Sequence, residues 1–303
     1  MCSYNMAAYV GEQLESIARQ TRKPDEIVVC DDGSADATVD IVQAFAATAT
    51  FPVRIVRNET RLGCNKNFEQ AISLCSGDLI FLCDHDDVWR PDKIALIAAL
   101  LDDDAAGAAF GDADVVGPDL TPLGFTLWDT CDFNPDRRRR FESGAQFPEL
   151  MRNNVMQGAA AAFRASHRAA IMPIPSEWQH DYWIALVVSA TSRIRFTERR
   201  VLDYRQHGLN LIGSGPPFRQ RPQTPLRRLR EQAQRWVRKA RSRRRYYEER
   251  LSSIQRELLP VVVLKERLTA LDPAVTGAAL AEVERRLERL QARRQAVERE
   301  LRR

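Results

Sequence analysis

Two short apolar runs in the first third of the chain each end in a cluster of carboxylates. The run EIVVC (26–30) leads into Asp31 and Asp32, and the run DLIFLC (78–83) leads into DHDD at 84–87. Uninterrupted apolar runs of this length are typical of strands buried on both faces of a sheet. Three carboxylates within four residues behind a buried strand are electrostatically costly unless a cation offsets their charge. This pattern constrains the fold more than any other feature.

The first ~115 residues alternate apolar runs with helical patterns. The strands that we expect lie at 26–30, 52–56, 78–83 and 107–110, and the helices at 11–20, 37–48, 67–75 and 91–101. This alternation predicts an α/β fold, a mostly parallel, Rossmann-like central sheet with helices on both faces.

Ligands of open parallel sheets bind outside the carboxyl ends of the strands. The DHDD turn at 84–87 is therefore the sharpest candidate site, and the Asp31-Asp32 pair on a neighbouring strand end strengthens it. Carboxylate oxygens favour Mg²⁺ or Mn²⁺, which leave positions open for substrate phosphates. The alternative is a solvated acidic turn in which Asp87 caps the next helix.

The remaining chain divides into a mixed region and a helical tail. Residues 115–147 are rich in turns, and we expect the four arginines at 137–140 in a solvated loop. Further predicted elements are a short helix in FPELMRNN, strands at 155–165, 193–198 and 199–208, and a helix at 180–192. Composition changes around 213–225, so we expect one domain over 1–213 and a basic helical extension over 214–303.

The formal net charge is only +4, but an acidic first domain is joined to a basic tail. The tail carries an apolar stripe over 226–251 surrounded by arginines. A heptad-like pattern over 280–301 indicates either a short coiled coil or an ordinary amphipathic helix. The positions of that pattern are Leu280, Val283, Leu287, Leu290, Val297 and Leu301. The tail could contact an anionic membrane surface or mediate self-association through its helices. Nucleic acid is not an expected partner, since no binding motif accompanies the charge.

Other global features exclude whole classes of protein. The composition, 44% hydrophobic and 28% charged, does not fit a collagen-like or disordered chain. No apolar run approaches ~18 residues, and the first residues lack a signal-peptide pattern. The six cysteines form no CxxC pair, which favours reduced thiols. We therefore expect a cytoplasmic protein, peripheral at the inner face of the membrane if the tail binds lipid.

Several blocks of sequence resemble glycosyltransferase family 2. They are CSYN, PDEIVVCDDGSADAT, NETRLGCNKNFEQAI and GDLIFLCDHDDVWRPDKI, in the order that the family has them. The later blocks MQGAAAAF, HDYWIALV and YRQHGLN are similar to its rhamnosyltransferase-like branch, which builds surface polysaccharides. The resemblance covers residues 1–213. It implies a GT-A fold, a nucleotide-diphosphate sugar donor and a divalent metal, Mn²⁺ or Mg²⁺.

The resemblance also implies roles for individual residues. Tyr4 and Asp32 would contact the donor base with Asp31 close by, and Arg61 would lie near the base or ribose. In the DxD element, Asp86 and Asp84 would hold the metal, with Asp84 nearer the ribose. Asp181 falls where the family keeps its general base. Arg205 and His207 lie where other members carry a Gln-x-x-Arg-Trp segment near the pyrophosphate, a segment that this chain lacks.

Chemistry supports these roles independently. A diphosphate leaving group gains negative charge, which a metal and Arg205 would stabilise, while a carboxylate such as Asp181 takes the proton of the acceptor hydroxyl. One in-line displacement then inverts the anomeric centre. Two alternatives to this role stay open: Asp181 caps the helix that it begins, or His180 is the base.

The sequence thus predicts a hexosyl transfer from a nucleotide-diphosphate sugar to a glycan or lipid-linked acceptor, with rhamnose as the sugar of the resembling branch. A metal-dependent nucleotidyltransferase is an alternative, although a Gly-rich basic loop after the first strand is missing. The other alternative is a non-catalytic membrane or assembly scaffold that retains the fold. Family members also have apolar residues before the Ser-Tyr-Asn segment, so we expect a truncated or misassigned start at Met1.

Overall fold

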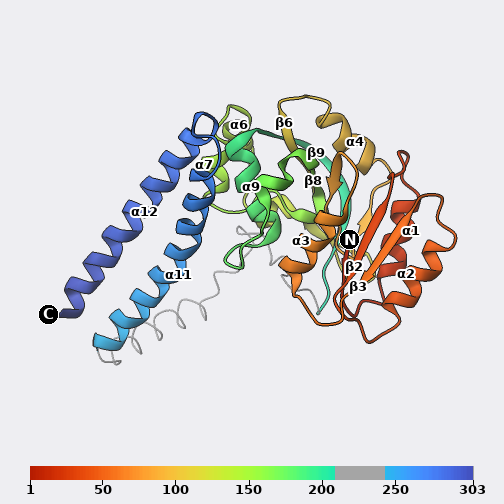
Figure 1. Ribbon diagram of the computed structural model, residues 1–303, viewed down its shortest axis with the longest axis horizontal. Helices are drawn as coiled ribbons and strands as arrows, with labels where there is room; N and C mark the ends of the chain where they lie inside the picture. The colour runs from red at the N-terminus through yellow and green to blue at the C-terminus, as the bar shows by residue number, and fades with distance from the viewer. Residues whose placement is uncertain (209–242, 303) are drawn as a thin grey trace. The chain divides into compact units, whose positions relative to one another are not determined.

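The computed structural model describes residues 1–208 and 243–302 of the chain. The chain divides into two compact units, Met1–Phe218 and Arg219–Arg303 (Figure 1). The predicted domain boundary after residue 213 lies outside the described residues.

A parallel three-stranded sheet opens the first unit. Strands β1 (Cys2–Ser3), β2 (Ile27–Asp31) and β3 (Val53–Arg57) lie in the order β1-β2-β3. All five residues of β2 are buried, as its apolar sequence predicts, whereas β3 at the edge of the sheet is partly exposed. The parallel pairing predicted for the strands at 26–30 and 52–56 is therefore correct.

Helices cover both faces of this sheet. Helices α1 (Val10–Ala18) and α2 (Thr38–Ala46) lie together on one side, and α3 (Cys64–Leu74) lies on the other (Figure 1). The buried face of α1 carries Leu14 and Ile17, as the apolar periodicity predicts. Connections between parallel strands are right-handed, so the direction in which the chain crosses the sheet decides which face a helix covers. The chain moves from β1 to β3 and then returns past β1 to β4, so α1 and α2 lie on one face and α3 lies on the other.

A second, mixed sheet follows. Its strands are β4 (Leu79–Phe81), β5 (Val88–Trp89), β6 (Ala106–Val116), β7 (Pro122–Thr126), β8 (Ala161–Arg164) and β9 (Arg193–Arg205). Their order is β4-β8-β6-β9-β5, with β7 paired to β6. Strand β6 is parallel to β9, and the other pairs are antiparallel. The Cys2 N–H donates to the Cys83 carbonyl at 3.3 Å, so β1 meets the chain directly after β4 and the two sheets adjoin.

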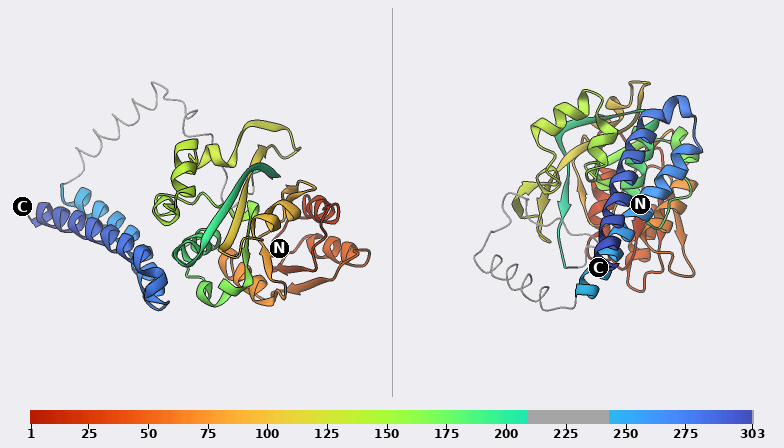
Figure 2. Two further views of the ribbon diagram at one scale, coloured as in Figure 1. Left: turned by 90° about the horizontal axis from the view of Figure 1, so that it is seen from above. Right: turned by 90° about the vertical axis from the view of Figure 1, so that its left-hand side faces the viewer.

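The helices that accompany the second sheet are mostly short. They are α4 (Lys93–Leu100), α5 (Leu127–Thr130), α6 (Pro135–Glu142), α7 (Gln146–Leu150), α8 (Arg168–Ile171), α9 (His180–Thr191) and the 3₁₀ turns η1 (Gly158–Ala160) and η2 (Ala165–His167). Figure 2 shows the long strands β6 and β9 running side by side through this part of the unit. The predicted α/β class is confirmed.

Several predicted strands need correction. The strand predicted over 155–165 is limited to β8 (Ala161–Arg164), and the 3₁₀ turn η1 (Gly158–Ala160) precedes it. The strand predicted over 107–110 continues to Val116, because its later residues are also buried and pair with β7 and β9. The two strands predicted over 193–208 form the single strand β9. Gly111 pairs with Thr197 and Asp112 with Arg200, so a local bulge in β9 absorbs the polar residues between them.

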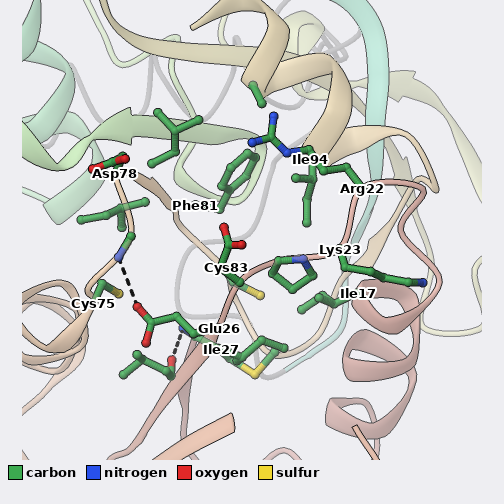
Figure 3. Close-up of a pocket in the computed structure, with 18 of the residues that line it drawn as sticks. Ile17, Arg22, Lys23, Glu26, Ile27, Cys75, Asp78, Phe81, Cys83 and Ile94 are labelled. Carbon is green, nitrogen blue, oxygen red and sulfur yellow. Dashed lines mark hydrogen bonds between the residues drawn. The ribbon is translucent and has the colours of Figure 1, made fainter. Parts of the chain in front are cut away.

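A cavity of about 200 Å³ lies between β2 and β4, with a lining that extends from Glu26 and Asp78 at the start of these strands to Cys83, directly before the acidic turn (Figure 3). Ile27 and Phe81 contribute apolar side chains to it, and the carboxylate of Glu26 at its edge is bound by Ser76 N–H at 2.6 Å. The amino group of Met1 donates to the Val28 carbonyl at 2.7 Å beside this cavity.

The described part of the second unit is an antiparallel hairpin of α11 (Arg243–Thr269) and α12 (Pro273–Arg302). The apolar stripe predicted over 280–301 contributes Val283, Leu287, Leu290 and Val297 to its buried interior. They pack with the buried residues Ile254, Leu258, Leu264 and Leu268 of α11. This stripe therefore has a partner within its own chain. Most of the stripe predicted over 226–251 lies outside the described residues.

Neither 1–208 nor 243–302 contains a helix with the length and apolar character that a bilayer crossing requires. All six cysteines carry free thiols, as their irregular spacing predicts.

The arginines at 137–140 are not in a solvated loop, which corrects the expectation from sequence. They belong to α6, where Arg137 is buried. Its Nε donates to Glu149 Oε2 at 2.7 Å and its terminal nitrogen to the Glu149 carbonyl at 3.0 Å. Arg140 donates to the other carboxylate oxygen of Glu149 at 2.6 Å, so one acid of α7 holds α6 in place.

Replacing Glu149 by Gln should destabilise the first unit, because it leaves the buried Arg137 without a countercharge. Breaking a buried pair on one side costs about 3 kcal/mol of unfolding free energy. Urea unfolding followed by circular dichroism measures the loss. Glu198→Gln is the matched control, since Glu198 is 70% exposed in its pair with Arg138 and should change stability little. Equal effects of the two substitutions would contradict this account.

Candidate active site

The carboxyl ends of β1, β2 and β4 meet at one edge of the first unit, as predicted. In the parallel ladder Ser3 pairs with Asp31, and the hydrogen bond from Cys2 to Cys83 brings the residue before Asp84 alongside. Tyr4, Asp32 and the turn at 84–87 follow these strand ends directly. The structure therefore brings together the acidic clusters that are about 50 residues apart in the sequence.

The two aspartates after β2 have different surroundings. Asp31 is buried inside its own turn, where Oδ1 accepts from Ser3 Oγ at 3.0 Å and Oδ2 accepts from Ser34 N at 2.8 Å. Asp32 instead binds the loop after β3: its two oxygens accept the backbone N–H groups of Leu62 at 2.7 Å and Gly63 at 2.9 Å. Asp31 therefore shapes the turn, and Asp32 fixes the neighbouring loop.

That loop places Arg61 over Tyr4. The guanidinium carbon lies 3.7 Å from the centre of the Tyr4 ring, and Arg61 Nε lies 3.7 Å from Asp32 Oδ2. The Arg61 side chain is 60% exposed, so this stacked pair borders solvent. Tyr4, Asp32 and Arg61 form one group, as the sequence predicts.

The turn at 84–87 is electrostatically loaded. Burial, followed by the negative charge of Asp86, raises the pKa of Asp84 to about 6. The same two causes, with the charge of Asp84 added, raise the pKa of Asp87 well above its usual value. Among the neighbouring charges that oppose these shifts is the ammonium of Lys93. The turn would gain free energy from a bound cation.

Arg205, at the end of β9, donates two hydrogen bonds to this turn. Its backbone N–H donates to Asp87 Oδ1 at 3.0 Å, and its Nε donates to the Asp86 carbonyl at 2.7 Å. Its terminal nitrogens bind the Pro118 carbonyl and the Glu12 carboxylate. The guanidinium is thus buried among protein acceptors and acts on the site through Asp86.

His207 contacts the acidic turn from the segment after β9. Its Nε2 lies 2.9 Å from Asp86 Oδ2, and its ring stacks on Tyr9 with 4.9 Å between ring centres. Among residues 1–208 and 243–302, no cluster of three or more His, Cys, Asp or Glu side chains is arranged to hold an ion alone. Mg²⁺ and Mn²⁺ commonly take one or two protein ligands and complete their shell with substrate oxygens and water. Asp86 and His207 fit that requirement.

Asp181 lies in the first turn of α9, as predicted, and is 8% exposed. Its Oδ2 accepts from Gly158 N at 2.9 Å, and its Oδ1 accepts from Tyr182 N at 2.7 Å. Gln179 is the N-cap residue of α9, so the alternative in which Asp181 caps this helix is wrong. A Cβ on Gly158 would lie 3.0 Å from Asp181 Cβ, so only glycine fits this approach without a shift.

His180, the alternative base, is half-buried and packs on α3. Its ring stacks on Phe68 with centres 3.8 Å apart, and its Nδ1 lies 3.9 Å from Cys64 Sγ. Burial lowers the pKa of His180, which favours a neutral ring.

Sequence reasoning missed several residues around the site. Asn65 at the start of α3 donates to the Trp178 carbonyl at 2.6 Å and accepts from His180 N at 3.1 Å, so it orients the start of α9. Asn67 donates to the Cys30 carbonyl at 2.8 Å at the end of β2. The two asparagines of the CNKN segment could have indicated these contacts from the sequence. Lys93, a single charged residue in the apolar helix KIALIAAL, could likewise have indicated a buried polar contact.

Comparison with solved structures defines the class of fold. TarS of S. aureus, residues 1–349 in complex with UDP-GlcNAc, has a TM-score of 0.56 at 17% identity, covering 93% of this chain and 69% of that one. A mannosyltransferase of Pyrobaculum calidifontis in complex with GDP-Man and Mn²⁺ has a TM-score of 0.52 at 17% identity, covering 98% and 72%. The fold is that of GT-A glycosyltransferases.

Residues 1–170 match the family model described as glycosyl transferase family 2, and the chain belongs to this family. An abequosyltransferase of Salmonella typhimurium is 31% identical over 105 residues, 34% of this chain and 32% of that protein. An uncharacterised glycosyltransferase of Nostoc is 24% identical over 220 residues, 69% and 64% of the two chains. An uncharacterised Mycobacterium tuberculosis protein is 35% identical over 102 residues, and the match spans 30% of its length.

The pKa of His180 has a consequence for stability. Its folded pKa lies below the unfolded value, so the unfolded chain binds the proton first as pH falls through about 6.5, and stability is lost there. His180→Gln should therefore reduce the fall in melting temperature between pH 7.5 and 5.5. Thermal unfolding of both proteins across this range measures the difference, and an unchanged pH dependence would contradict the assignment of a neutral ring stacked on Phe68.

Proposed function

We propose that the protein is an inverting glycosyltransferase that moves a hexosyl group from a nucleotide-diphosphate sugar to a glycan or lipid-linked acceptor. The observation that carries the proposal is the contact of His207 Nε2 with Asp86 Oδ2 at 2.9 Å, beside Asp84 at the carboxyl ends of the strands. Membership of glycosyl transferase family 2 supports sugar transfer as the reaction.

The donor nucleotide would bind at the ends of β1 and β2. Tyr4 and Arg61 offer a flat, stacked surface for the base, and Asp32 lies against Arg61. Asp84 would accept hydrogen bonds from the ribose. Asp31 contributes by holding the turn, since both of its oxygens bind Ser3 or Ser34.

Asp86 and His207 would hold a divalent cation, Mn²⁺ or Mg²⁺. Such an ion supplies positive charge against the leaving diphosphate, where negative charge grows during the reaction. Arg205 keeps Asp86 in place through its backbone carbonyl. The solved neighbours that carry nucleotides or Mn²⁺ in their descriptions are consistent with this assignment.

Asp181 would act as the general base. Its Oδ2 is oriented by Gly158 N–H and would take the proton of the acceptor hydroxyl. The acceptor oxygen bonds to the anomeric carbon as the bond to the diphosphate breaks, and the electron pair leaves with the diphosphate. One such displacement inverts the anomeric centre.

Rhamnose is the sugar that we propose, from the similarity of the later sequence blocks to the rhamnosyltransferase-like branch. The acceptor would belong to surface polysaccharide synthesis at the cytoplasmic side of the membrane. The basic C-terminal unit would then serve in peripheral membrane contact or in self-association.

Nucleotide binding is the first test of this proposal. Nucleoside diphosphates with Mn²⁺ should raise the melting temperature of the protein by several degrees at saturating concentration, because ligand binding to the folded state adds free energy. Asp86→Asn should abolish the rise that depends on Mn²⁺, while Asp104→Asn, at a fully exposed side chain, should keep it. Stabilisation by none of the nucleotides would exclude the donor site and leave the scaffold alternative.

Removing the base tests the catalytic role. Asp181→Asn should lower kcat about 10² to 10⁴ fold while nucleotide binding stays intact, because only the proton transfer is lost. Asp136→Asn is the matched control, since Asp136 also lies in the first turn of a helix but is exposed on α6. Near-normal transfer by a folded Asp181→Asn protein would remove Asp181 from the mechanism.

A further inference from the structure

Lys93 is a fully buried lysine next to the candidate site. It is the first residue of α4, and it is among the largest side chains that are completely shielded from solvent. A buried ammonium costs free energy unless other groups bind or balance it. The groups around Lys93 therefore show what the chain gains from it.

One partner of Lys93 is the 3₁₀ turn η1. Its Nζ donates to the Ala159 carbonyl at 2.5 Å and lies 3.6 Å from the centre of the Trp89 ring. These two contacts join Lys93 to two separate elements, because Trp89 belongs to β5 and Ala159 belongs to η1. The position of η1 thus depends on Lys93.

The same turn carries the hydrogen-bond donor of Asp181. Gly158 directly precedes Ala159, and its N–H binds Asp181 Oδ2 at 2.9 Å. The turn is closely packed against α9, because a Cβ on Gly158 would already lie 3.0 Å from Asp181 Cβ. A shift of the Ala159 carbonyl would therefore move the donor of the Asp181 carboxylate.

Lys93 also contacts the chain that leaves the acidic turn after β4. Trp89, whose ring centre lies 3.6 Å from Lys93 Nζ, follows Asp87 by two residues. Burial lowers the pKa of Lys93 to about 7, and the charges of Asp87 and Asp84 oppose that shift. One side chain thus connects the turn at 84–87 with the turn that supports Asp181.

We propose that Lys93 is a positioning residue for sugar transfer, which fixes the acidic turn of the donor site and the Asp181 carboxylate relative to each other. This inference rests on the proposed function. Lys93 itself exchanges no proton and touches no reacting atom in this account. Its role is the geometry of the two carboxylate groups, on which the rate of a displacement depends steeply.

The test uses the full-length Lys93→Met protein, with kcat measured at saturating nucleotide sugar and Mn²⁺. We expect kcat to fall at least about 30-fold, because the base and the donor turn lose their common support. Lys23→Met controls for the loss of a lysine that binds a backbone carbonyl, since Lys23 Nζ donates to the Ala18 carbonyl at 2.5 Å on the surface. Ile97→Ala controls for lost stability, because Ile97 is fully buried on the same helix. Both controls should keep kcat within about threefold.

A double-mutant cycle separates positioning from a structural role. If Lys93 acts through Asp181, the Lys93→Met/Asp181→Asn protein should be no slower than Asp181→Asn alone, within about threefold. Multiplied losses, an unchanged kcat in Lys93→Met, or an equal loss in Ile97→Ala would each overturn the proposal.

If Lys93→Met does not fold, Lys93→Arg carries the test, since it keeps the cation. At least a tenth of wild-type kcat in that variant supports the proposal, and a kcat as low as that of Asp181→Asn overturns it. Failure of the proposed function itself has a different signature, because the wild-type protein would then turn over no nucleotide sugar.

Discussion

The carboxylates at 84–87 repel one another, and the surrounding structure supplies the groups that offset this repulsion. Burial behind β4 removes the water that would screen these charges, and it raises the pKa of Asp84 and Asp87. Two other segments, the end of β9 and the start of α4, meet the turn with compensating groups. Arg205 donates to it twice, His207 binds Asp86, and Lys93 faces it from α4. The turn therefore keeps several buried carboxylates close together at the expense of stability, as functional sites commonly do.

These compensating groups couple the site to the docking of the two sheets. Arg205 and His207 come from the end of β9 in the second sheet, whereas Glu12 and Tyr9, which contact them, come from the region of α1 beside the first sheet. The same side chains that organise the acidic turn thus bind the two halves of the unit together. A substitution here should affect folding and ligand binding at once, which is why the experiments above pair each site residue with a control.

The sequence predicted the elements that depend on local pattern. Apolar runs predicted β2 and β4, the acidic residues after them predicted the position of the site, and the helical pattern over 180–192 placed Asp181 at the start of a helix. The parts that it missed depend on contacts between distant residues. Nothing local shows that Arg205 is buried against Glu12, 193 positions away, or that Arg137 finds Glu149 across two helices. The contact of Lys93 was missed for the same reason, because the carbonyl that it binds is 66 residues away in the sequence.

The central claim is that Asp86 and His207 form a cation site at the carboxyl ends of the strands. Anomalous diffraction at the manganese edge, from crystals grown with Mn²⁺ and a nucleoside diphosphate, tests it most directly. The account predicts a single strong anomalous peak that contacts the Asp86 carboxylate and His207 Nε2, next to the diphosphate. A bound nucleotide with no peak at these two side chains, or with manganese bound elsewhere, would contradict it.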